Sequence, residues 1–175
     1  AMLDYLFGRE AWQSWQSALN RCFAACKEDV FISHVGAMLS RGSVACRVNV
    51  KRLTTDTLLD YLQAIGWQRD KLPDKLLSVL SQCDRFTLAL DVNQQVLPRI
   101  GLECIMLDIQ KWDKFLGELS DHGWMTHEQA VHLQKWIQVT TPSQYPQSYP
   151  EHHLIASLWR PTHEFSRFVQ RISHV

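Results

Sequence analysis

The residues best suited to chemistry in this sequence alternate with apolar ones. Along residues 44–50 every second side chain is apolar, and Arg47, Asn49 and Lys51 lie on the opposite face of the strand that this alternation predicts. Because the apolar face is expected to meet helices, the polar face must point to solvent or into a lumen. Side chains on this second face are therefore the first candidates for a binding site.

Four cations make up the candidate phosphate- or substrate-binding set: Arg41, Arg47, Lys51 and Arg99. Arg41 and Arg99 lie near the ends of expected strands and would join the other two. Arginine and lysine side chains that converge on one cavity suit a phosphate or a diphosphate. The alternative is an ordinary solvated sheet face without a site, which is the commoner outcome because antiparallel sheets often keep one side wet.

Glu103 is the first candidate catalytic residue. An internal offset of 57 residues gives it the position of Cys46, on the apolar face, where a carboxylate would be partly desolvated and its pKa raised, as is typical of a general base. A change of one residue in strand register would instead place Glu103 in water or against Arg99. We favour this second alternative slightly, because register is weakly specified by a single sequence.

His34 is the second candidate catalytic residue. It belongs to the tetrapeptide Ile-Ser-His-Val, which recurs at residues 172–175 with His174 in the same place. A structural hydrogen bond is the simpler role for two equivalent histidines, because repeats preserve packing before chemistry.

The sequence contains no recognisable metal or cofactor motif. His127 and His132 are five residues apart on an expected helix and diverge, and residues 152–153 have no carboxylate or thiol at zinc spacing. A Gly-rich phosphate loop, a Gly-x-Ser-x-Gly elbow and an Asp-rich diphosphate–magnesium motif are also missing. We therefore expect no metal and no cofactor, and an NTPase, a hydrolase or a metal-dependent terpenoid enzyme is disfavoured.

The composition predicts one ordinary globular domain spanning residues 1–175. The chain is 46% hydrophobic and 21% charged, and 18 basic residues balance 18 acidic ones, which argues against a general affinity for nucleic acid or membrane. Five scattered cysteines without a Cys-x-x-Cys motif favour reduced thiols in the cytoplasm. No apolar run approaches the ~20 residues needed to span a bilayer.

The elements that would position the candidate residues follow a repeated order. Gly66-Trp67 recurs as Gly123-Trp124, 57 residues later, and apolar residues on both sides keep this offset. Self-similarity at a fixed spacing indicates a repeated supersecondary unit. We expect an α+β fold of αββα units at about residues 10–66 and 73–138, with a third unit beginning at 161–175.

The individual elements can be assigned from periodicity, caps and breakers. We expect an antiparallel sheet, open or part of a barrel, with helices on one face. A third unit that stops inside a strand leads us to expect an incomplete domain, able to self-associate through a sheet edge. The expected helices cover residues 10–27, 54–66, 73–80, 108–123, 126–138 and 160–171, and the expected strands cover 30–40, 44–50, 86–92 and 100–107, with a turn at 93–98 and no regular element at 140–150.

This αββα order resembles the prenyltransferase barrel. The resemblance spans residues 10–175 and rests on the order of elements alone. It implies antiparallel strands around a solvent-accessible lumen, with helices outside, and five units in a complete barrel. It also implies a transferase acting on an isoprenoid diphosphate and an aromatic or peptide acceptor, with basic and Tyr side chains of the lumen holding the diphosphate.

Two functions follow as expectations. In the transferase, the four cations would bind the anionic leaving group, and Glu103 or His34 would polarise the acceptor. In the alternative, the chain is a non-catalytic peptide- or protein-binding module that uses its open sheet or its Tyr-Pro segment. Residues 32–41 and 97–104 also resemble segments of uncharacterised bacterial proteins, cyanobacterial ones included, and this resemblance implies no activity.

Overall fold

The computed structural model describes residues 2–37, 45–67, 72–73, 75–106, 108–139, 152–158 and 168–172, with side chains as far as Lys135 apart from a few near the N-terminus and at element ends. Arg41, His174 and residues 140–150, for which expectations were stated above, lie outside the described residues.

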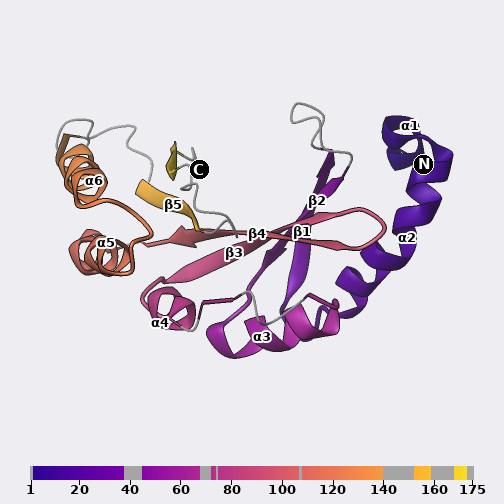
Figure 1. The fold of residues 1–175 in the computed structure, drawn as a ribbon, viewed down its shortest axis with the longest axis horizontal. Helices are drawn as coiled ribbons and strands as arrows, with labels where there is room; N and C mark the ends of the chain where they lie inside the picture. The colour runs from indigo at the N-terminus through magenta and orange to yellow at the C-terminus, as the bar shows by residue number, and fades with distance from the viewer. Residues whose placement is uncertain are drawn as a thin grey trace.

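The strands form one antiparallel sheet in which each strand pairs with its neighbour in the chain. The described strands leave this sheet open, with β1 at one edge and β6 at the other, so the expected α+β class with an antiparallel sheet is confirmed (Figure 1). The strands are β1 (Phe31–Ala37), β2 (Cys46–Lys51), β3 (Arg85–Val92), β4 (Val96–Ile105), β5 (His152–Leu158) and β6 (Phe168–Ile172).

The helices form an arc along one side of this sheet, from α2 through α3 and α4 to α5, and no described helix lies across the middle of the other side (Figure 1). Their bounds are α1 (Met2–Phe7), α2 (Arg9–Ala24), α3 (Thr55–Ala64), α4 (Leu76–Leu80), α5 (Trp112–Asp121) and α6 (His127–Val139), and a 3-10 turn, η3 (Ile109–Lys111), precedes α5.

The core lies between the helices and the apolar face of the sheet. Val48 pairs with Leu90, and Leu90 pairs with Ile100, so one apolar row crosses three strands with almost no exposure. Apolar stripes on α2, α3, α4 and α5 pack against this face in a single cluster. Each buried aliphatic side chain contributes about 1.5–3 kcal/mol, so this layer supplies most of the stabilisation.

The predicted helix ends are confirmed in detail. The Thr54 hydroxyl accepts a hydrogen bond from the backbone N–H of Thr57, and that of Thr126 accepts one from Gln129, whose side chain accepts in return from Thr126 N–H. Gly66 and Gly123 follow α3 and α5 with φ of 78° and 70°, a conformation that favours glycine.

Three assignments made from the sequence are wrong. Pro98 lies inside β4 and not in a turn, because β4 begins at Val96. His152 and His153 begin β5, where a loop was expected, and residues 168–171 belong to β6, where a helix was expected. Both errors concern strands whose formation depends on pairing: β5 is held between β4 and β6, so its partners are distant in sequence.

The gapless offset of 57 residues does not hold within the strands. It equates Val48 with Ile105, yet Val48 faces the core, while Ile105 pairs with Arg85 on the opposite side of the sheet. Side chains alternate between faces with a period of two, so an odd offset exchanges the faces. The order of elements does recur, but residue-by-residue repetition of an αββα unit is not confirmed.

Candidate functional site

We call the side of the sheet opposite the helices the polar face. Strand alternation and register assign to it His34, Arg47, Asn49, Lys51, Thr87, Ala89, Asp91, Arg99, Gly101 and Glu103. In this way five of the six candidate residues from the sequence come to the same face, and Arg41 lies outside the described residues. Pairing arranges the face in rows: Gly36–Arg47–Asp91, His34–Asn49–Ala89–Gly101 and Thr87–Glu103.

Arg47 is engaged by Asp91 on the neighbouring strand. Its Nε and Nη2 atoms donate to Oδ1 and Oδ2 of Asp91 at 2.8 and 2.9 Å, and the two side chains are 27% and 15% exposed. A bidentate pair of this geometry uses the planar face of the guanidinium and neutralises its charge. Arg47 is therefore not a bare cation waiting for an anion. Sequence reasoning missed Asp91, because only strand register places it opposite Arg47.

The other cations do not converge with Arg47. Lys51 is exposed at the far end of β2, four residues and about 13 Å from Arg47 along the strand. Arg99 is exposed on β4, two strands away, at the end of the face where Asp91 lies. The structure therefore places these cations at separate points around the face.

Glu103 lies on the polar face and not on the apolar one. It pairs with Thr87 on one side and with Ser157 on the other, and its side chain is half-buried. Cys104, one residue later, takes the buried position on the helix side, which matches the alternative register.

His34 is exposed on the edge strand, and its Nδ1 lies 3.0 Å from the Ser33 hydroxyl. Because β2 and β3 separate β1 from β4, His34 and Glu103 are about 14 Å apart across the sheet. In the described arrangement the two candidate catalytic groups are too distant to act together on one small group.

The middle row of the polar face is built from small residues. Ala89 and Gly101 are paired neighbours, and a Cβ added at Gly101 would lie 3.4 Å from the Cβ of Ala89. Longer side chains stand on both sides: Arg47 and Asp91 in one row, Glu103 in the other. We call Ala89 and Gly101 the floor of the site.

Asn49 presents an unmet acceptor next to this floor. It pairs with Ala89, and its side-chain Oδ1 is buried without a hydrogen-bond partner among the described residues. Its backbone carbonyl is satisfied by the Ser33 hydroxyl at 3.3 Å. Buried polar atoms are nearly always hydrogen-bonded, so an exception marks a place where a donor from outside the described chain belongs. Alternation in the sequence put Asn49 on the polar face, but gave no sign of this role.

The five cysteines are all free thiols. Burial raises the pKa of Cys22 and of Cys46 to about 11, so both are neutral, inert core groups near neutral pH. In the part of the chain that the structure describes, no three His, Cys, Asp or Glu side chains are grouped to hold a metal ion. Across the same residues, no helix has the length and apolar character needed to cross a bilayer.

Comparison with known proteins adds no assignment: no family model matches this sequence, and no curated protein or solved structure is significantly similar to it.

Proposed function

We propose that this protein is a binding module that holds a peptide segment on the polar face of its sheet. The observation that carries the proposal is the buried, unmet Oδ1 of Asn49 beside the floor. Leaving such an acceptor unpaired costs about 1–3 kcal/mol, and a backbone N–H of a bound peptide would satisfy it. The small floor residues allow a peptide backbone to approach this atom.

The charges around the floor support a peptide over a polyanion. Lys51 and Glu103 stand on the two strands that flank β3, on either side of Thr87, and neither has an ion-pair partner among the described side chains. One cation and one anion suit a ligand with groups of both signs. Arg47, the cation with the best geometry for a phosphate, is already neutralised by Asp91.

The test begins with selection of binders from a random dodecapeptide library on the complete chain, followed by calorimetry on the selected peptides. We expect Asn49→Ala to weaken binding about tenfold, which corresponds to about 1.4 kcal/mol for a lost hydrogen bond. Gly101→Val should weaken it further, because a branched side chain would stand over the floor.

The controls separate a local effect from a general one. Lys51→Ala should weaken binding of peptides that carry a carboxylate, whereas Lys114→Ala, an exposed cation of α5 on the helix side, should leave affinity unchanged. Equal affinity of all four variants and the original protein would contradict the proposal, and so would a library that yields no binder.

The second candidate is the transferase acting on an isoprenoid diphosphate. The observation that favours it is the placement of Arg47, Lys51, Arg99 and Glu103 on one face. Because Asp91 occupies Arg47, we expect pyrophosphate and an isoprenoid diphosphate to bind weakly to the original protein and more tightly to Asp91→Asn, with an affinity that falls as salt rises. Calorimetry that detects neither ligand at millimolar concentration, with either protein, would remove this candidate.

A further inference from the structure

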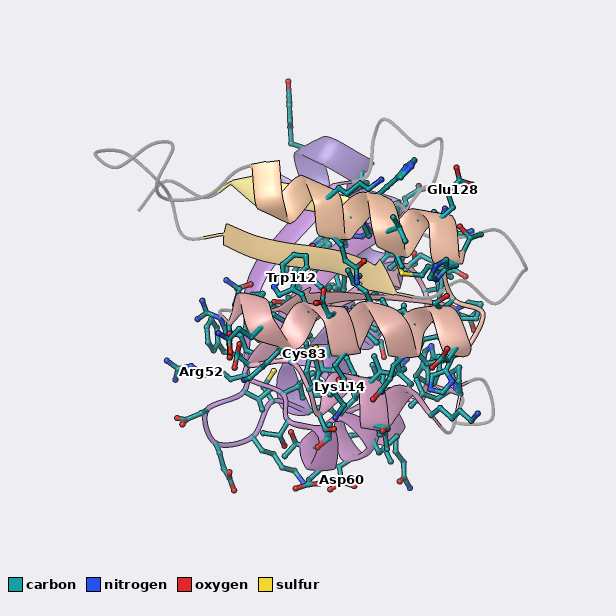
Figure 2. All side chains as sticks on the ribbon, turned by 90° about the vertical axis from the view of Figure 1, so that its left-hand side faces the viewer. Arg52, Asp60, Cys83, Trp112, Lys114 and Glu128 are labelled. Carbon is teal, nitrogen blue, oxygen red and sulfur yellow. The ribbon has the colours of Figure 1, made fainter. Side chains whose placement is uncertain are left out.

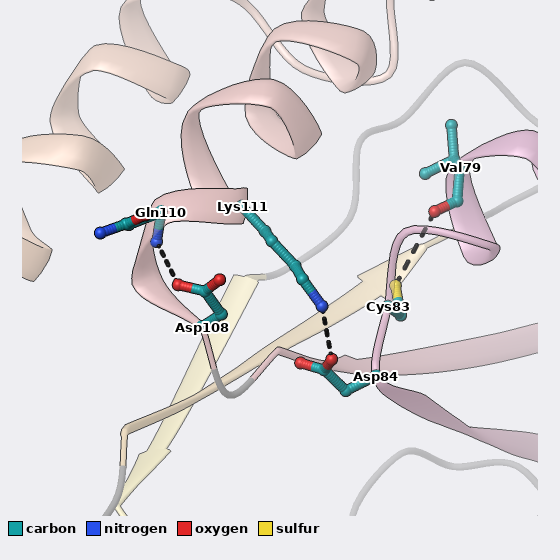
Figure 3. Close-up of polar contacts among 6 residues, drawn as sticks. All are labelled: Val79, Cys83, Asp84, Asp108, Gln110 and Lys111. Carbon is teal, nitrogen blue, oxygen red and sulfur yellow. Dashed lines mark hydrogen bonds and ion pairs between the residues drawn. The ribbon is translucent and has the colours of Figure 1, made fainter.

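Cys83 and Cys104 form a pair of thiols away from the polar face. Cys83 is half-buried in the turn between α4 and β3, and Cys104 is fully buried on the helix side of β4. The Cys104 thiol donates a hydrogen bond to the Cys83 sulfur. The Cys83 thiol in turn donates to the carbonyl oxygen of Val79, at 3.8 Å (Figure 3). The two sulfur atoms are therefore in direct contact.

The backbone holds this contact in place. Asp84 N–H donates to the carbonyl oxygen of Ile105 at 3.0 Å, and these residues follow Cys83 and Cys104 directly in the chain. The next pairs, Arg85 with Ile105 and Phe86 with Cys104, continue as the β3–β4 ladder. Regular strand pairing thus fixes the turn that carries Cys83 against the strand that carries Cys104.

A cation lies close to the more accessible thiol. Lys111 Nζ is 2.7 Å from Asp84 Oδ1, and its ammonium group also interacts electrostatically with Cys83 (Figure 3). Figure 2 shows Cys83 beside α5, on the side of the molecule where Lys114 is also labelled. The reactive form of a cysteine is the thiolate, which a neighbouring ammonium favours, so Cys83 is placed to react first.

We infer that Cys83 and Cys104 are a reversible redox-modification site that forms an intramolecular disulfide with a low-molecular-weight disulfide, such as glutathione disulfide, as oxidant. The Cys83 thiolate attacks one sulfur of the oxidant, whose S–S bond breaks and releases one glutathione thiolate. Cys104 then gives up its proton and attacks the Cys83 sulfur, and the second glutathione leaves as a thiolate. The protein loses two hydrogen atoms and two electrons, and the oxidant gains them.

The other thiols lack this arrangement. Cys26 donates to the backbone carbonyl of Cys22, at 3.5 Å, and not to its sulfur. Cys46 is buried in the apolar face of β2. Desolvation also keeps Cys22 and Cys46 protonated, which makes them slow nucleophiles.

The experiment treats the complete folded chain with excess glutathione disulfide, stops the exchange with acid, and reads intact mass and alkylated thiols. We expect a species lighter by two hydrogen atoms, with free thiols reduced from five to three, and one disulfide-linked peptide pair containing Cys83 and Cys104. Dithiothreitol should restore five thiols. Cys104→Ala should stop at a glutathione adduct on Cys83, and the control Cys26→Ser should still form the disulfide.

Three results would overturn the inference: a glutathione adduct that persists on Cys83 in the original protein, a disulfide between Cys22 and Cys26, or a Cys83 that does not react in the folded chain. If circular dichroism shows that Cys104→Ala does not fold, Cys83→Ser replaces it, because its side chain is only half-buried. This variant should keep all four remaining thiols free after the same treatment.

Discussion

Arg47 shows how one neighbour decides the chemical role of a residue. In the sequence it is a cation on a polar strand face, and in the structure it is one half of a two-bond ion pair with Asp91. Asn49, two residues later, has the opposite history: an ordinary polar residue proves to hold a buried oxygen with no partner among the described residues. The character of the polar face therefore follows from which residues already have partners.

The residue-scale prediction concerns the Arg47–Asp91 pair. Asp91→Asn should lower the free energy of unfolding by about 1–2 kcal/mol, because it leaves a half-buried guanidinium without its charged acceptor. Urea denaturation measures the change. Asp29→Asn is the matched control: Asp29 is 88% exposed and 3.9 Å from Arg52, so its loss should change stability by less than about 0.5 kcal/mol. Equal effects of the two substitutions would show that the buried pair has no special weight.

At the scale of elements, helix ends are specified by a few residues acting locally. The Thr54 and Thr126 caps and the glycines at 66 and 123 satisfy the backbone groups that a helix leaves unpaired at its ends. Helix α5 offers an internal comparison, because Gly117 lies within it and Gly123 lies just after it.

The element-scale prediction has opposite signs at these two glycines. Gly123→Ala should lower the free energy of unfolding by about 1 kcal/mol, because Gly123 has a φ of 70° that alanine adopts with strain. Gly117→Ala should raise it by about 0.5–1 kcal/mol, because alanine is the better helix former and an added Cβ would meet no atom within 4 Å. Chemical denaturation of both variants decides the matter, and the same sign for both would contradict the helix-end role of Gly123.

At the scale of the whole molecule, the core and the candidate site occupy opposite sides of one sheet. Helices cover the apolar side, so most of the stabilising burial is there, and the polar face can vary without changing core volume (Figure 1). The edge strand β1 carries no charged residue and no proline, the usual protections of an exposed edge, and no described strand pairs with its outer side. The thiol pair lies on the helix side, so its oxidation and peptide binding can be tested separately.

The sequence alone predicted the features that depend on near neighbours in the chain. The alternation in residues 44–50 predicted the two faces of β2, the apolar spacing predicted α2, and Thr54, Thr126 and the two glycines predicted helix ends. Each signal involves residues within about five positions of one another, which is the range over which helix and strand periodicity acts.

Only the tertiary structure decided what lies opposite what. Asp91 meets Arg47 across 44 residues of chain, Glu103 faces Thr87 and not the core, and the Cys83 turn is held against β4. Residues 152–158 became a strand through pairing with distant partners. The physical reason is register: a shift of one residue moves every side chain of a strand to the other face, and no local pattern in a single strand specifies its alignment with another.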